Sequence, residues 1–218
     1  MPNKTEAYVH TRSRNGGANE ITLGVLSVIE EDDRATQRAI SQKLGIAVGL
    51  TNSYLKRCVK KGFIKVRQIP ANRYAYYLTP QGFAEKSRLT AEYLTTSFNF
   101  FRAARKQCVQ LFETCQNHQW QRVVLYGKSD LAEIATLSAG ETSVDVIGVI
   151  APGSNQDTFV GLKVFPDFDA VGPVDAVIIT DLSEPQARFD ELAKHISLER
   201  ILAPRFMHIS RIKPSLAE

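Results

Sequence analysis

A glycine between two short helical segments limits the fold of the N-terminal half more than any other feature. Thr36 suits the N-cap of a first segment that runs to Leu44. Gly45 follows where left-handed backbone geometry commonly ends a helix. A second helix is predicted over Val48–Lys61, and Gly62 ends it. Two short helices joined by a turn of three or four residues that contains glycine indicate a helix-turn-helix.

The residues around this pair complete a winged helix. A repeating apolar face predicts a further helix over Glu20–Glu31. After the pair, Phe63–Ile69 alternates apolar and polar residues, as a half-buried strand does. Pro70–Arg73 is typical of a turn, and Tyr74–Thr79 is typical of the returning strand. A helix-turn-helix followed directly by a hairpin is a winged helix, which we place at residues 20–79.

The second helix of such a motif lies with its outer face in the major groove of DNA. Thr51, Leu55 and Cys58 recur at helical intervals and should face inward. Asn52 can form two hydrogen bonds with adenine, whereas Lys56 suits a phosphate. The predicted DNA-binding residues on the helix and the wing are Val48, Gly49, Asn52, Ser53, Lys56, Arg57, Lys65, Arg67 and Arg73. The alternative is that they are only solvated surface residues.

The charge of the chain is divided unevenly. Residues 1–122 carry 19 Lys and Arg against 9 Asp and Glu, and residues 123–218 carry 8 against 14. The net charges of +10 and −6 sum to the +4 of the whole chain. A basic first half fits a partner that is a polyanion, such as double-stranded DNA, although an uneven charge can also serve solubility alone.

The winged-helix region resembles the MarR-type regulators associated with exopolysaccharide synthesis. The stretches that carry the resemblance, which covers about residues 20–105, are Leu44–Lys56, Lys61–Lys65, Tyr77–Lys86 and Leu89-Thr90. The resemblance implies a transcription regulator, with polysaccharide-synthesis genes as targets. Ala47 departs from the family, which usually has a capping serine there, so the second helix should lack a side-chain cap.

A long helix should connect the two halves over residues 80–119. Thr79 and Pro80 favour its start. Along it, residues recur at alternating steps of four and three, the spacing of a coiled-coil seam: Leu94, Phe98, Phe101, Arg105, Cys108, Phe112 and Cys115. We expect this seam to form a homodimer, because pseudo-palindromic sites usually require two winged helices. The alternative is an amphipathic helix packed on its own domains.

The three cysteines, at positions 58, 108 and 115, fit neither a disulfide framework nor the spacing of a zinc site. No metal site is therefore expected. Cys108 and Cys115 lie on the predicted seam, where they could be redox sensors. We expect them to be small apolar residues instead, because free cysteine usually behaves as a buried hydrophobe.

From Arg122 onward, short apolar runs alternate with helical stretches. Strands are predicted over residues 123–127, 144–150, 162–165, 175–180 and 200–202, with helices over 130–138 and 185–195. This alternation implies a Rossmann-like parallel α/β domain. The overall fold class is therefore α/β, with a disordered basic arm at residues 1–19, the winged helix, the connecting helix, and the α/β domain at residues 120–218.

Ligands of such a sheet bind beyond the carboxyl ends of its strands. The predicted ligand-binding residues follow the first and fourth strands: Gly127, Lys128, Ser129, Asp130, Thr180 and Asp181. Backbone amides at the start of the helix predicted over residues 130–138 could hold a phosphate. The alternative is that Asp130 caps that helix. The dinucleotide fingerprint G-x-G-x-x-G is absent, because the segment 127–132 keeps a single glycine. This counts against NAD.

The order of these elements resembles the nucleotide-binding N-terminal domain of polysaccharide-synthesis enzymes, among them sugar-nucleotide-modifying and undecaprenyl-phosphate sugar-transferase families. The resemblance covers about 85 residues, and the segments that carry it are Val123–Gly127, Val146–Ile150, Gly161–Phe165 and Val174–Thr180. The resemblance implies a nucleotide or nucleotide sugar as effector.

Together these features predict a homodimeric, ligand-responsive transcription regulator. The alternatives are an NAD(H)-type redox-sensing regulator, a nucleotide-sugar enzyme with a DNA-binding appendage, or a second half that only assembles the dimer. His118, His195 and His208 have no acid or nucleophile partner in the sequence, so we expect no catalytic site and no enzyme. No apolar run reaches the roughly 20 residues that span a membrane, so we expect a cytoplasmic protein without a membrane partner.

Overall fold

The computed structural model describes residues 14–69 and 73–211 of the 218-residue chain. The chain divides into two compact units, Met1–Ser97 and Phe98–Glu218, which are described separately. Most of the predicted N-terminal arm, residues 1–13, and most of the predicted wing turn, residues 70–72, lie outside the described residues.

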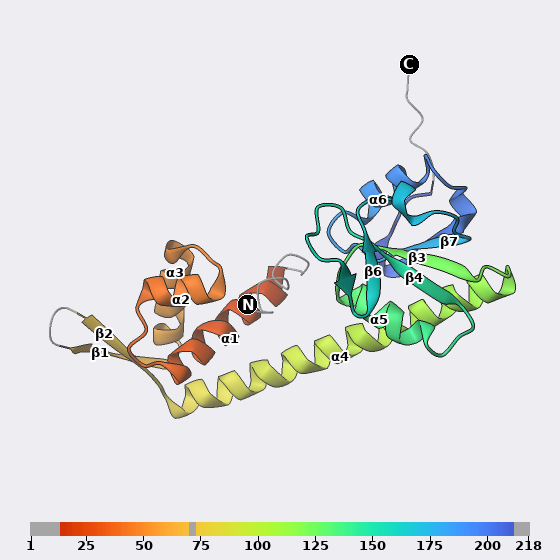
Figure 1. The fold of residues 1–218 in the computed structure, drawn as a ribbon. Coiled ribbons are helices and arrows are strands. Elements are labelled where there is room, and N and C mark those ends of the chain that lie inside the picture. The colour runs from red at the N-terminus through yellow and green to blue at the C-terminus, as the bar shows by residue number, and fades with distance from the viewer. Residues whose placement is uncertain (1–13, 70–72, 212–218) are drawn as a thin grey trace, which may run out of the picture. The chain divides into compact units, whose positions relative to one another are not determined.

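The first unit is a winged helix-turn-helix (Figure 1). Its elements are α1 (Arg14–Glu31), α2 (Gln37–Leu44), α3 (Val48–Lys60), β1 (Ile64–Ile69), β2 (Arg73–Leu78) and the first part of α4. Helix α1 begins at Arg14 and not at Glu20, so the arm predicted for residues 1–19 is wrong from Arg14 onward. Each residue added to a helix that has already formed brings one more hydrogen bond. The sequence before Glu20 has no apolar pattern, so it did not indicate that the helix extends to Arg14.

The predicted turn chemistry is confirmed in this unit. The Thr36 hydroxyl oxygen accepts a hydrogen bond from the Ala39 amide at 3.1 Å, and Gly45 has a φ of 62°. Ala47 precedes α3 without a side-chain cap. The backbone amide of Tyr76 in β2 donates to the Asp33 carbonyl at 2.8 Å, which ties the wing to the segment after α1.

Helix α4 (Pro80–Asn117) is a single helix of 38 residues, as predicted. The Thr79 hydroxyl oxygen accepts a hydrogen bond from the Gly82 amide at 3.0 Å and so caps its start. Although α4 is long enough to cross a bilayer, no helix in the described part of the chain is both long and apolar enough to do so.

The second unit is a six-stranded sheet in the order β5-β6-β4-β3-β7-β8. The parallel strands are β3 (Arg122–Tyr126), β4 (Asp145–Ile150), β6 (Leu162–Phe165), β7 (Ala176–Ile179) and β8 (Ile201–Leu202). The two-residue strand β5 (Thr158–Phe159) pairs antiparallel with β6 and was not predicted, because a strand this short shows no alternation.

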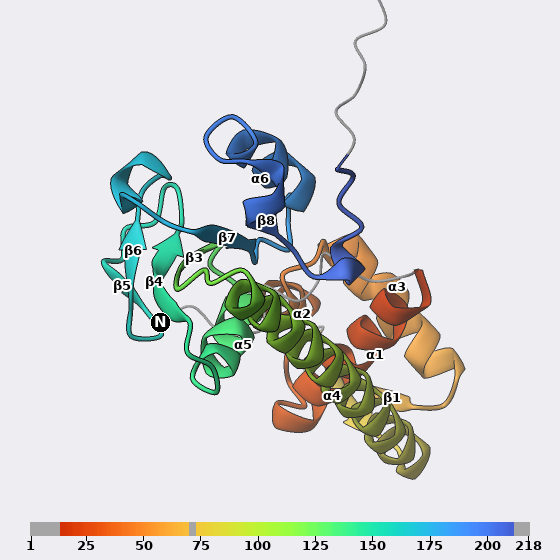
Figure 2. The same ribbon diagram turned by 90° about the vertical axis from the view of Figure 1, so that its right-hand side faces the viewer.

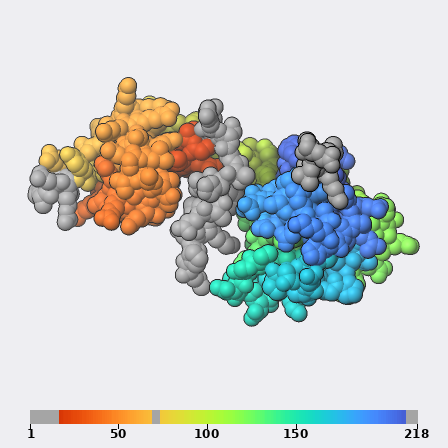
Figure 3. Space-filling model, turned by 90° about the horizontal axis from the view of Figure 1, so that it is seen from above, coloured from red at the N-terminus to blue at the C-terminus, as the bar shows by residue number. Residues whose placement is uncertain are grey.

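Helices cover both faces of this sheet (Figure 2). Helix α5 (Asp130–Ala139) and the end of α4 pack on one face, and α6 (Pro185–Leu192) packs on the other. Figure 3 shows the α6 face in blue. Single 3-10 turns at Asp169–Val171, Leu198–Arg200 and Arg205–Met207 complete the connections.

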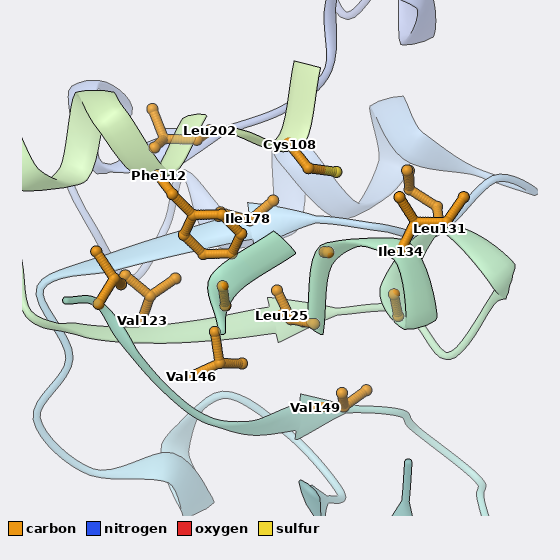
Figure 4. Close-up of a cluster of buried hydrophobic side chains, with 14 of the residues drawn as sticks. Cys108, Phe112, Val123, Leu125, Leu131, Ile134, Val146, Val149, Ile178 and Leu202 are labelled. Carbon is orange, nitrogen blue, oxygen red and sulfur yellow. The ribbon is translucent and has the colours of Figure 1, made fainter. Parts of the chain in front are cut away.

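The end of α4 corrects the predicted dimer seam. Cys108, Phe112 and Cys115 are buried in one cluster with residues of β3, β4 and β7, and Figure 4 labels Cys108 and Phe112 in it. Arg105 forms an ion pair with Glu141. The seam is therefore wrong at Cys108, Phe112 and Cys115, where the alternative of an amphipathic helix packed on its own domain is correct. An α/β core can use the same apolar period as a coiled coil. Leu94, Phe98 and Phe101 remain exposed.

Candidate nucleic-acid interface and strand-end loops

Helix α3 buries one face and exposes the opposite one, as predicted. Thr51, Leu55 and Cys58 are buried in the core of the first unit. Gly49, Ser53 and Lys56 are exposed on the opposite face, and Asn52 is half-buried at its edge. Lys60 follows Lys56 by one turn and is also exposed. The prediction missed Lys60, although the helical period of 3.6 residues could have found it.

Arg57 departs from this face. It lines a cleft of about 30 Å³ together with Asn19 and Thr22 of α1 and Glu85 of α4. The guanidinium-bearing side chain thus lies on the flank of α3 that faces α1. The spacing of residues in the sequence could not show which flank of α3 faces α1, because that depends on how the two helices pack.

The wing carries cations on one face of its hairpin. Lys65 lies opposite Tyr77 in the strand register, and Arg67 lies opposite Ala75. Residues opposite each other, and residues two apart in one strand, share a face. Lys65, Arg67 and Tyr77 are therefore on the same face, and all three are exposed. Arg73 is the first residue of β2, but its side chain lies outside the described part of the structure.

The ion pairs of the first unit separate its cations into two groups. Arg34, Lys43, Lys86 and Arg88 have carboxylate partners in the segment Glu30–Asp33 or within α4. Among the described residues no carboxylate pairs with the other cations, which are Arg38, Lys56, Arg57, Lys60, Lys61, Lys65 and Arg67.

The sequence explains this separation. From Arg34 to Ala84 the chain has ten Lys or Arg residues and no Asp or Glu. Six of the seven unpaired cations lie on α3, on the wing or at the link between them, and Arg38 lies on α2. The absence of acidic residues leaves positive charge uncompensated on the elements that a winged helix turns toward DNA.

Comparison with known families agrees with this geometry. A family described as winged helix-turn-helix DNA-binding matches residues 19–65, from within α1 to the start of β1. The chain therefore contains a winged helix-turn-helix DNA-binding domain. The match covers less than half of the chain and does not distinguish the MarR type from other winged helices.

No curated protein sequence matches the chain. Similar solved structures include human N-acetylserotonin methyltransferase with S-adenosylmethionine (SAM), at 12% identity over 76% of this chain and 67% of that one, TM-score 0.30. An O-methyltransferase of neocarzinostatin biosynthesis with SAM and 2-hydroxy-5-methyl naphthoic acid is 14% identical over 88% and 65%, TM-score 0.27. PigF with SAH is 13% identical over 88% and 61%, TM-score 0.22.

These matches correct one prediction. We expected that the chain is not an enzyme, whereas the similar structures include two methyltransferases. That expectation is overturned. At TM-scores of 0.22 to 0.30 the matches give this chain neither an activity nor a cofactor.

The predicted ligand-binding residues come together at the carboxyl ends of two adjacent strands. Strands β3 and β7 are neighbours, and their following helices cover opposite faces, which defines a topological switch point. Gly127 and Ser129 lie after β3, and Thr180 and Asp181 lie after β7. The strand order therefore brings both predicted loops to one edge of the sheet.

The two loops are bonded to each other. The Ser129 hydroxyl donates to the Thr180 carbonyl at 2.6 Å, and the Thr180 hydroxyl donates to the Gly127 carbonyl at 2.6 Å. Gly127 has a φ of 108°, and a Cβ atom there would lie 2.3 Å from the Asp181 amide nitrogen. The close approach that this glycine allows is to the chain's own backbone.

Ser129, and not Asp130, caps α5. The Ser129 hydroxyl oxygen accepts hydrogen bonds from the amides of Leu131 and Ala132, so the alternative in which Asp130 caps this helix is wrong. Asp130 is exposed as the first residue of the helix. Lys128 is also exposed, and its ammonium group contacts the Gln156 side chain and lies 5.6 Å from the Phe159 ring centroid.

Arg188 anchors the loop after β7. Its guanidinium lies 2.9 Å from the Asp181 carboxylate, 3.4 Å from Glu191 and 3.6 Å from Glu184. Partial burial opposes ionisation of Asp181, but hydrogen bonds from Arg188 and from two loop amides outweigh it and lower the pKa of this carboxyl. Burial, with the hydrogen bond to Glu191, raises the pKa of Tyr126 to about 12. The loop is thus held by charge as well as by backbone contacts.

Proposed function

We propose that the protein is a transcription regulator that binds double-stranded DNA through α3 and the wing. The observation that carries the proposal is the separation of paired from unpaired cations in the first unit. If these cations served solubility alone, there would be no reason for six of the seven unpaired ones to gather on α3, the wing and the link between them. A polyanionic partner supplies that reason.

In this proposal α3 enters the major groove. Gly49, Asn52 and Ser53 lie over the base edges, whereas Lys56 and Lys60 reach phosphates on either side. Lys65 and Arg67 on the wing, with Arg73 at its tip, contact the backbone of the same duplex. Arg57 belongs to the flank near α1, so we assign it a weaker contribution.

The test compares an unpaired with a paired lysine. In Lys56→Gln and Lys65→Gln, the dependence of log K on log salt for duplex binding should become shallower by about 1 for each phosphate that the protein no longer neutralises. Lys43→Gln is the matched control, since Lys43 is paired with Glu31. Equal salt slopes in all three variants, or no duplex binding by the wild-type protein, would contradict the proposal.

We propose that the α/β domain is the regulatory half, with a nucleotide or nucleotide sugar as its effector. The strand order supports this, because it gathers Gly127, Ser129, Thr180 and Asp181 at the switch point, with Lys128 and Asp130 beside them. Polysaccharide-synthesis genes are the proposed targets, on the strength of the two sequence resemblances.

A thermal-shift screen with UDP, nucleotide sugars, NAD(H) and coenzyme A tests the effector. A ligand at 100 times its Kd stabilises the fold by about 2.7 kcal/mol. A shift with a nucleotide sugar supports the proposal, and a shift with NADH alone favours the redox regulator. Turnover of the sugar favours an enzyme with a DNA-binding appendage. No shift, with intact DNA binding, reduces the domain to assembly.

A further inference from the structure

The exposed side chains of α3 change in length along the helix. On the outer face of α3 and on the flank that carries Val48, the exposed or half-buried residues of the first two turns are short: Val48, Gly49, Asn52 and Ser53. Farther along the same face they are Lys56 and Lys60, whereas Leu50 and Arg57 belong to the other flank. Short side chains let the beginning of a recognition helix come close to base edges, and long cations farther along can reach outward to phosphates.

Asn52 has its full hydrogen-bonding capacity available. It is half-buried, and in the described part of the chain no hydrogen bond engages its side-chain amide. The neighbouring Ser53 differs, because its hydroxyl donates to the Gly49 carbonyl at 3.0 Å. An amide that offers one acceptor and a donor side by side matches N6 and N7 of adenine.

Val48 lies one turn before Asn52 and is 46% exposed. Residues four apart share a face of a helix and are separated by about 6 Å along its axis. Valine is also a weaker helix former than most polar alternatives, because its branched side chain loses freedom there. An exposed isopropyl group adds no packing energy to the free protein. In the major groove, the C5-methyl group of thymine offers it an apolar contact.

We infer that α3 reads a half-site with a thymine and an adenine in adjacent base pairs. Val48 covers the thymine C5-methyl, and the Asn52 amide bonds N6 and N7 of the adenine. The inference rests on the proposed function and adds a base preference to it. Gly49 lies between the two residues in the sequence, and a Cβ atom at this position would meet nothing within 4 Å in the protein. The glycine therefore serves the approach of the duplex and not the fold.

The experiment begins with selection of duplexes from a random library by the full-length protein. Deoxyuridine then replaces each selected thymidine, and 7-deaza-adenine replaces each adenine. For the wild-type protein, removal of the methyl group that Val48 covers should weaken binding about fourfold. Removal of the N7 that Asn52 bonds should weaken it about tenfold.

Three variants assign these effects. Val48→Ala should bind the thymine and uracil duplexes equally, and Asn52→Ala should bind the adenine and 7-deaza-adenine duplexes equally. Leu50→Ala is the matched control, because Leu50 is 41% exposed on the other flank of α3, and it should keep both preferences. Alanine is the best helix former, and circular dichroism confirms that each variant is folded.

The outcomes separate the inference from the proposed function. A Val48→Ala variant that still prefers thymine to uracil overturns the inference, and so does a selected site without adjacent thymine and adenine. Duplex binding without any sequence preference overturns it as well but leaves DNA binding intact. A folded protein that binds no duplex overturns the proposed function, and the inference with it.

Discussion

Gly127 is needed for contact between two loops of the protein itself. Its φ of 108° is strained for any side chain, and the Asp181 backbone fills the space of a Cβ atom. We therefore expect Gly127→Ala to destabilise the α/β domain by more than about 3 kcal/mol. Urea denaturation measures this destabilisation.

Gly153→Ala is the control for backbone strain alone. Gly153 has a φ of 74°, but a Cβ atom there meets nothing within 4 Å. It should cost only about 1–2 kcal/mol, the penalty of a left-handed conformation. Equal destabilisation at the two positions would show that the close approach to Asp181 is unimportant.

The three thiols are buried, and burial raises the pKa values of Cys58, Cys108 and Cys115 from 9.0 to about 11. Below pH 9 the folded and unfolded states both keep these protons. Between pH 9 and 11 the unfolded state loses them first, so the free energy of unfolding falls as the pH rises. Each thiol contributes a decrease of up to about 3 kcal/mol.

Denaturation curves at pH 8 to 11 measure this decrease, and a variant with alanine at all three positions should lose less stability over the same range. The raised pKa values also argue against a redox-sensing role for Cys108 and Cys115, because the thiolate is the reactive form. Alkylation of the native protein at pH 8 as fast as that of a free thiol would contradict this.

At the scale of elements, α3 allows stability and DNA binding to be separated. Gly49→Ala should stabilise the first unit by about 0.5–1 kcal/mol, because glycine inside a helix is costly and the added methyl group meets no atom. The same methyl group should weaken duplex binding if α3 approaches DNA at this position. Thermal denaturation and fluorescence anisotropy measure the two effects.

Gly140→Ala is the matched substitution at the end of α5. Its added Cβ atom would lie 3.6 Å from the nearest atom, an ordinary contact. It should leave DNA affinity unchanged. A Gly49→Ala variant that binds DNA as tightly as the wild type would show that α3 does not come close at this point.

The helices and the wing were predictable because their signals are local. Thr36, Gly45 and Gly62 mark helix ends through their own backbone or side-chain chemistry. Long-range contacts were not predictable. Gly82 looked like an ordinary glycine in the sequence, yet its added Cβ atom would lie 2.0 Å from the Phe63 carbonyl oxygen. Nothing near Gly82 in the sequence reports that contact.

The candidate sites follow the same division. The period of α3 gave its outer face, including Asn52 and Lys56, but the packing of α1 decides where Arg57 lies. In the α/β domain the strand order was enough to place Gly127 beside Asp181. The sequence could not show that these loops bond to each other, because that depends on the orientation of the Ser129 and Thr180 side chains.

At the scale of the whole molecule, α4 contributes side chains to the cores of both units and also carries apolar side chains that remain exposed. Leu89 of α4 is buried in the first unit, and Cys108, Phe112 and Cys115 are buried in the second. Phe98 and Phe101 are 55% and 41% exposed in the second unit. We propose that a second copy of the chain covers these two rings, because a pseudo-palindromic DNA site needs two winged helices.

Replacing both rings tests this proposal. The double variant Phe98→Ser, Phe101→Ser should be monomeric in analytical ultracentrifugation at concentrations where the wild-type protein is dimeric. It should bind a single half-site as well as the wild type does but lose affinity for a site with two half-sites, because the second binding event is no longer intramolecular. Leu137→Ser is the control, since Leu137 is 64% exposed on α5. A wild-type protein that is monomeric at every concentration, or a double variant that remains dimeric, would exclude this face of α4 as the interface.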